Sequence, residues 1–146
     1  MNVGDICSRG AIHVTESASL RDVAQLMQEH RVGAVVVTRP GPQPIATGII
    51  TDRDIVRAQL EHVADLSRLR VADVMTPSPF TLRHDETVED AVEQMREHNV
   101  RRAPVVTPQG SLVGLVSADD LVTEAARELD ALSRLLSGRQ GAGGRQ

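Results

Sequence analysis

Two short motifs in the chain carry groups that could bind a ligand. Thr51 is followed three residues later by Asp54, and Ser117 is followed three residues later by Asp120. A carboxylate can accept hydrogen bonds from both hydroxyls of a ribose, and a nearby hydroxyl can face a phosphate or sugar oxygen. The same spacing is that of a capping box, in which the two side chains satisfy the first amides of a helix without any ligand. The two interpretations are compatible, because a helix N-terminus also attracts an anion.

Among the charged residues of the chain, Arg101 and Arg102 are the best candidates for binding phosphate. They directly precede the β-rich run that begins at Ala103. The planar fork of a guanidinium group can engage two phosphate oxygens at once. The alternative is a pair of solvated side chains at the edge of a strand.

The two hydroxyl and carboxylate motifs lie at matching points of an internal duplication. Residues 3–32 align with residues 71–100 without a gap, and residues 48–56 align with residues 114–122. The first copy has two extra residues in the Pro-rich stretch between these blocks. A duplicated unit normally folds as two like halves, and the seam between halves is a natural place for a ligand.

The duplication also predicts that the two clefts differ. Gly33 and Ala34 stand where the second copy has Arg101 and Arg102, so the first copy lacks this charge. We therefore expect the better anion site to combine Thr51 and Asp54 with one of these arginines across the seam.

Each copy is predicted to fold as strand, helix, strand, strand and helix. Apolar residues recur at helical spacing over residues 20–27 and 88–95. A hydroxyl residue with an acid three positions on begins each of these helices, in the reciprocal pattern of a capping box: Ser19 with Asp22, and Thr87 with Asp90. Two β-rich runs separated by a turn follow, and the closing helices are expected from Asp52 to about Leu60 and from Ala118 to about Leu136.

These elements predict the organisation of the chain. Residues 1–62 form the first repeat, 63–70 a short linker, 71–137 the second repeat with an extended C-terminal helix, and 138–146 a Gly-rich, disordered tail. The last helix carries a long apolar stripe made of Leu121, Ala125, Leu129, Leu132 and Leu136. Either a partner subunit in a homodimer covers this stripe, or the helix folds back onto its own module.

Composition excludes several classes of function. The net charge is −4 and Phe80 is the single aromatic residue, so neither a basic surface nor a stacking platform for nucleic acid is expected. Cys7 is the single cysteine, which rules out an intrachain disulfide and is typical of a small buried side chain. The N-terminus lacks a signal-peptide pattern and no apolar run is long enough to span a bilayer, so a soluble cytoplasmic protein is predicted.

The paired pattern resembles the cystathionine-beta-synthase (CBS) domain family. The resemblance rests on residues 5–7 and 73–76 before each first strand, and on the closing segment Gly-Ile-Ile-Thr-Asp-Arg-Asp at residues 48–54. It implies an α+β fold in which two tandem CBS repeats pack as one pseudo-two-fold module, here a stand-alone module and often a dimer. The family's clefts bind adenosyl ligands, so AMP, ADP or ATP is expected, and NAD or S-adenosylmethionine less so. No cofactor is required.

The resemblance also implies roles for individual residues. Asp54 and Asp120 would hold the ribose, Thr51 and Ser117 would contact the ribose or the α-phosphate, and Gly48 and Gly114 would let the backbone pass close to the ligand. Arg53 would help, whereas Ala118 and Asp119 break the matching pair in the second copy. Adenine would sit between aliphatic side chains near residues 12–14 or 80–82, and this places His13, Val14 and Thr81 at the site.

Three functions are consistent with these features to different degrees. The first is a regulatory nucleotide sensor whose partner effector is unknown. The second is a structural adaptor dimer with vestigial clefts, which the uncharged Gly33 and Ala34 and the long last helix favour. The third, a nucleotide hydrolase, lacks a recognisable base, nucleophile or metal cluster, so no enzyme is expected. His30 and His98 occupy matching helix ends, but no second ligand follows at a metal-like spacing.

Overall fold

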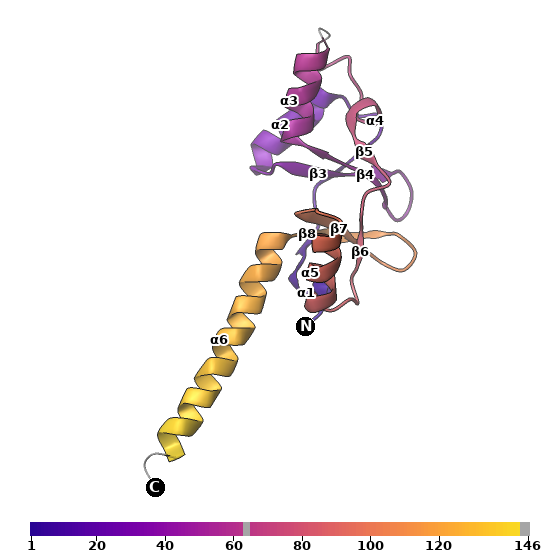
Figure 1. Cartoon of the computed structure of the whole chain (residues 1–146). Coiled ribbons are helices and arrows are strands. Elements are labelled where there is room, and N and C mark those ends of the chain that lie inside the picture. The colour runs from indigo at the N-terminus through magenta and orange to yellow at the C-terminus, as the bar shows by residue number, and fades with distance from the viewer. Residues whose placement is uncertain (63–64, 144–146) are drawn as a thin grey trace.

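Two four-stranded sheets form the framework of the protein. The computed structural model describes residues 1–62 and 65–143. One sheet has the order β2 (His13–Thr15), β3 (Ala34–Arg39), β4 (Ile45–Thr51), β5 (Thr76–Pro77). The other has the order β1 (Ser8–Arg9), β8 (Leu112–Ser117), β7 (Arg102–Val106), β6 (Leu82–Arg83). The helices are α1 (Val3–Ile6), α2 (Leu20–His30), α3 (Asp52–Glu61), α4 (Val71–Val74), α5 (Val88–Glu97) and α6 (Ala118–Gly143). The expected α+β module of two like repeats is confirmed (Figure 1).

The predicted helix starts are confirmed with one difference. The Ser19 hydroxyl accepts a hydrogen bond from the Asp22 amide at 3.1 Å, and the Thr87 hydroxyl accepts one from the Asp90 amide at 3.2 Å. The expected return bond from each acid is not found, because the exposed Asp22 and Asp90 side chains face solvent. Only half of the reciprocal pattern therefore forms, and it is enough to define where α2 and α5 begin.

The first segment of each predicted repeat pairs with the sheet of the other repeat. β1 pairs with β8 of the second repeat, and β5 pairs with β4 of the first repeat, both in antiparallel fashion. Helices α1 and α4 follow the same exchange, because Val3 is buried in the core of the second repeat and Val71 in the core of the first. The predicted boundaries 1–62 and 71–137 therefore do not coincide with the two halves of the structure.

The exchange requires two glycines. A Cβ atom on Gly114 would lie 2.5 Å from the backbone oxygen of Ser8, and one on Gly48 would lie 2.7 Å from Sδ of Met75 and 3.0 Å from the backbone oxygen of Thr76. The predicted role of these glycines in letting the backbone approach a ligand stays a prediction. They let the backbone of an exchanged segment approach, and that segment already fills the space in front of them.

The two hairpin turns also meet across the seam. The Leu112 amide donates to the Pro44 carbonyl at 2.8 Å, and the Ser111 hydroxyl donates to Oε1 of Gln43 at 2.9 Å. The two Pro- and Gly-containing turns thus hold each other, in addition to the exchanged segments. In the linker, residues 66–68 form a turn and residues 63–64 lie outside the described residues.

Aliphatic side chains fill both cores, as the near absence of aromatic residues requires. Leu20, Val35 and Ile50 are fully buried in the first repeat, and Leu82 and Leu121 in the second. Cys7 is buried beside the second core, and burial raises the pKa of its thiol above the ordinary value. Its interpretation as a small buried side chain is confirmed.

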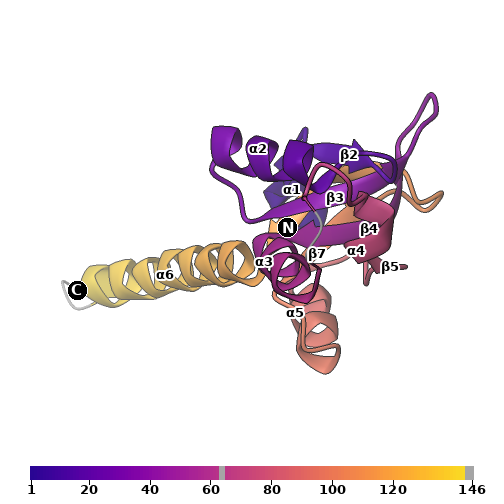
Figure 2. The same cartoon turned by 90° about the horizontal axis from the view of Figure 1, so that it is seen from above.

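Helix α6 departs from the prediction at its C-terminal end. It continues to Gly143, past the expected end near Leu136, so residues 138–143 of the predicted disordered tail are helical; residues 144–146 lie outside the described part. Gly138 and Gly141 each cost only about 1 kcal/mol relative to alanine in a helix, which does not force a stop at Gly138. The helix points away from both sheets in the two views, so the alternative that it folds back is wrong (Figures 1 and 2). Of the predicted stripe, Leu121 alone is buried in the core of its own repeat, and Leu129, Leu132 and Leu136 are exposed. None of the described helices has the length and apolar composition needed to cross a membrane.

The glycine contacts lead to a stability prediction. We expect Gly114→Ala to lower the free energy of unfolding by about 1–3 kcal/mol, because the rigid backbone of Ser8 must move. Gly48→Ala should cost less, since the nearest atom belongs to the flexible Met75 side chain. Gly138→Ala is the control without a clash, because nothing lies within 4 Å of its Cβ position; alanine in the helix should leave the stability unchanged or raise it by up to about 1 kcal/mol. Urea denaturation measures all three; equal stability of Gly114→Ala and wild type would contradict the proposed need for glycine.

Candidate ligand-binding site

A cavity lies where the two repeats meet. It has a volume of about 490 Å³, and we call it the central cleft. Its lining combines the ends of β4 and β8 with the starts of α3, α6 and β7: Thr51, Asp52, Arg53, Arg101, Arg102, Ser117, Ala118 and Asp119. The sequence analysis placed Thr51 and Asp54 with Arg101 or Arg102 across the seam; Thr51 and both arginines line this cavity, and Asp54 does not.

The backbone explains why these residues converge. In each repeat a strand leads into a helix without a loop, β4 into α3 and β8 into α6, so both helix N-termini open at the central cleft. An N-terminus carries free amides and a partial positive charge. The positive N-terminal ends of α3 and α6 therefore both lie at the central cleft, in addition to its arginines.

The two hydroxyl and carboxylate motifs form complete capping boxes. In the first, Asp54 N donates to Thr51 Oγ1 at 3.2 Å, and Thr51 N donates to Asp54 Oδ2 at 2.9 Å. In the second, Asp120 N donates to Ser117 Oγ at 3.1 Å, and Ser117 N donates to Asp120 Oδ2 at 3.3 Å. The capping interpretation is thus confirmed for both motifs.

Asp54 and Asp120 do not line the central cleft. Asp54 faces a cavity of about 310 Å³ that it shares with Arg57 and Asp73. Asp120 faces a cavity of about 420 Å³ that it shares with Asp5 and Arg127. Each of these outer cavities is closed by an exchanged helix, α4 or α1, which explains why the sequence alone did not separate the carboxylates from the arginines.

The charge of the central cleft is mixed and leans positive. Arg53, Arg101 and Arg102 face Asp52 and Asp119. The ion pairs found within residues 1–62 and 65–143 all involve other arginines, so these three guanidinium groups are not neutralised by a direct salt bridge in the described part. Asp52 accepts a bond from the backbone amide of Arg53 at 2.8 Å. The cleft can therefore attract an anion, and a guanidinium group can engage it directly.

The asymmetry expected from Gly33 has a structural counterpart. The backbone is equivalent on both sides: the Ala118 amide donates to the Arg101 carbonyl at 2.8 Å, and the Asp52 amide donates to the Gly33 carbonyl at 3.0 Å. A Cβ atom on Gly33 would lie 3.2 Å from Oδ2 of Asp52. The first repeat therefore has a carboxylate beside the position that corresponds to Arg101, so the positive charge is concentrated on one side.

The three residues expected near adenine lie outside the central cleft. His13 Nδ1 and Thr38 Oγ1 are 3.0 Å apart at the edge of the first sheet, Val14 is buried in the first core, and Thr81 is half-buried just before β6. The structure does not bring them to the arginines.

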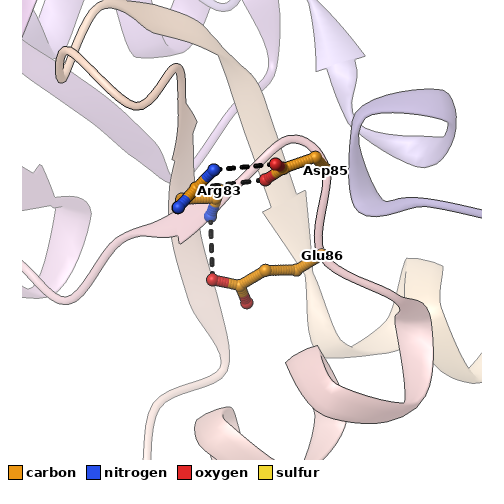
Figure 3. Close-up of polar contacts among 3 residues, drawn as sticks. All are labelled: Arg83, Asp85 and Glu86. Atoms are coloured by element: carbon orange, nitrogen blue, oxygen red, sulfur yellow. Dashed lines mark hydrogen bonds and ion pairs between the residues drawn. The ribbon is translucent and has the colours of Figure 1, made fainter.

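The arginine that follows Thr81 and Leu82 is already paired. Figure 3 shows Arg83 bound to Asp85 through Nε at 3.1 Å and Nη2 at 2.8 Å, while its backbone amide reaches Glu86 at 3.4 Å. Its guanidinium group therefore already forms an ion pair with Asp85, in the turn that leads to α5. Arg101 and Arg102 remain the better phosphate candidates.

Sequence reasoning did not identify Asp52 as part of the site or predict the two outer cavities. Asp52 follows the capping threonine directly and is the first helical residue, which could have placed it at the cleft. Within the described part of the chain, no group of three or more His, Cys, Asp or Glu side chains is placed to hold a metal ion.

Comparison with known proteins identifies the family. The CBS domain model matches residues 3–61 and 71–127, so the chain belongs to the CBS domain family and carries two copies in tandem. The chain is 31% identical to the CBS domain-containing protein YhcV of Bacillus subtilis over 134 residues, which is 92% of each protein. It spans only 61% and 63% of the length of the first two curated relatives that it matches.

Two similar structures contain nucleotides. CBSX2 from Arabidopsis thaliana in complex with AMP is 28% identical, has a TM-score of 0.72, and the match covers 86% of this chain and 96% of that one. The CBS domain of a bacterial CNNM/CorC family Mg²⁺ transporter in complex with ATP is 25% identical with a TM-score of 0.73, covering 85% and 86%. The fold and the tandem family assignment are thus both supported.

The capping boxes lead to a second stability prediction. Thr51→Ala should lower the free energy of unfolding by about 1 kcal/mol in the absence of any nucleotide, because the Asp54 amide loses its acceptor. Thr51→Ser keeps the hydroxyl and is the matched control. Thermal unfolding without ligand measures the effect, and an unchanged Thr51→Ala protein would show that the cap contributes nothing.

Proposed function

We propose that the chain is a regulatory module that binds an adenine nucleotide, AMP, ADP or ATP, with its phosphates in the central cleft. The observation that supports this most is the convergence of three arginines and two helix N-termini on one cavity. The AMP and ATP complexes of two similar proteins indicate the class of ligand.

The ribose has a candidate acceptor beside the central cleft. The capping bond of Asp54 engages Oδ2, which leaves Oδ1 to accept from ribose hydroxyls at the start of α3. Asp120 is placed in the same way in the second repeat. With phosphate bound by Arg101 or Arg102, the nucleotide would extend from the seam toward an outer cavity.

Regulation is proposed to act through a change in the seam. A ligand shifts an equilibrium between two arrangements of the repeats only if it binds them with different affinity. The central cleft draws its lining from both repeats, so its ligand is sensitive to their relative position. We propose that the chain is not an enzyme and forms a homodimer. We also propose that an effector protein binds it and responds to the change at the seam. The cytoplasmic location stays a prediction from the sequence.

A second candidate is the structural adaptor dimer with vestigial clefts. The observation in its favour is that both capping boxes give Asp54 and Asp120 a structural role that needs no ligand. Ligand titration separates the two functions.

The first functional prediction concerns thermal stability. AMP, ADP and ATP should raise the melting temperature of the purified protein, whereas adenosine should raise it less because it has no phosphate for the cleft. A ligand at a hundred times its dissociation constant adds about 2.7 kcal/mol if it binds only the folded state. NAD and S-adenosylmethionine belong in the same series. Absence of a shift with every compound would favour the adaptor.

The second functional prediction concerns the arginines. Arg101→Ala or Arg102→Ala should lower the ratio of AMP affinity to adenosine affinity by about tenfold or more, because a charge-assisted hydrogen bond contributes roughly 1.5–3 kcal/mol. Arg96→Ala is the matched control, since Arg96 lies on the exposed surface of α5 in a pair with Glu93. Calorimetry at low and high salt gives the ratio. An unchanged ratio in both cleft variants would assign phosphate binding to backbone amides alone.

A further inference from the structure

Helix α6 carries an apolar stripe that nothing in the described chain covers. Four apolar side chains of this helix are largely exposed to solvent: Val122 (62%), Leu129 (69%), Leu132 (58%) and Leu136 (59%). Both views show the helix leaving the second repeat and projecting away from the rest of the protein (Figures 1 and 2). An exposed apolar surface of this kind marks an interaction site.

The stripe has the spacing of a coiled-coil seam. Val122, Ala125, Leu129, Leu132 and Leu136 follow one another at alternating intervals of three and four residues. Four charged residues lie on the opposite face and pair within the helix, Arg134 with Asp130 at 3.1 Å and Arg127 with Glu124 at 3.6 Å. The occupant of the stripe is therefore a helix whose contacting face is apolar, and α6 itself fits this description between Ala125 and Leu136.

We propose that α6 pairs antiparallel with α6 of a second copy of the chain, which gives the homodimer proposed above its interface. The two-fold axis would pass between Asp130 and Ala131. In this register Leu129 packs against Leu132 of the second copy, and Ala125 packs against Leu136 of the second copy. The same register makes the two helices overlap from end to end, because their midpoint lies between these two residues.

The residues beside the seam support this register. Glu128 comes opposite Leu135 of the second copy, and Ala126 comes opposite Ser133, so no like charges meet. Sliding the helices by one heptad in one of the two directions would place Glu128 against Glu128, which is destabilising.

The antiparallel direction follows from side-chain size. A parallel pair would set Ala125 against Ala125 and leave a gap in that layer, whereas the antiparallel pair sets alanine against leucine. Antiparallel helix dipoles also attract each other. Each module then lies at the opposite end of the helix pair from its partner.

Cysteine cross-linking tests the direction. The double variant Ala125→Cys with Leu136→Cys should form a covalent dimer on mild oxidation, while neither single variant should, because residues 125 and 136 face each other only in the antiparallel pair. In a parallel pair each single variant would cross-link to itself. The native Cys7 is buried and far less accessible to oxidation. Cross-linking of the single variants would overturn the proposal.

Light scattering tests the interface. Leu129→Glu should raise the dimer dissociation constant at least about a hundredfold, because a charge enters an apolar layer. Ala131→Glu places the same charge on the outward face and should leave the dimer intact. A monomeric wild type, or a dimer that survives Leu129→Glu, would overturn the proposal. The AMP response of the melting temperature, measured on the same variants, reports on the nucleotide site separately.

Discussion

The unity of the module depends on the close contact between each exchanged segment and a glycine of the other repeat. At Gly114 the backbone of Ser8 occupies the place where a Cβ atom would stand, and Gly48 faces Met75 and Thr76 in the same way. Without this contact, β1 and β5 could not complete their sheets, and the fully buried Val3 and Val71 would leave their cores. The seam that contains the central cleft exists only because both contacts form.

The backbone of the central cleft is nearly symmetric between the two repeats, but its charged side chains are not. Matching amides donate to matching carbonyls on both sides of the seam, yet Arg101 stands on one side and the carboxylate of Asp52 fills the space beside Gly33 on the other. Duplication thus supplied the shape of the cleft twice, while a few side chains concentrate positive charge on one half. Substitutions at such positions change the charge of the cleft with little cost to the fold, because the lining residues are exposed or half-buried.

The features that the sequence predicts well are local. Helix starts follow from hydroxyl caps and helix faces from apolar spacing, and both are determined within a few residues of Ser19, Thr51 or Thr87. The exchange could not be predicted, because two nearly identical repeats offer two nearly identical sheet edges to the segment at residues 3–9. For the same reason the sequence placed Asp54 with the arginines, although α4 encloses it in a separate cavity.

The exchange of segments also bears on the origin of the chain. A single-copy ancestor with this pattern would have an open sheet edge and an unfilled core, and a second molecule could provide both by lending its own first residues. Fusing two such genes replaces an encounter between molecules by a tethered one, at an effective concentration on the order of millimolar. Once the two copies are part of one chain they no longer need to be identical, and a difference such as Arg101 and Arg102 against Gly33 and Ala34 becomes possible.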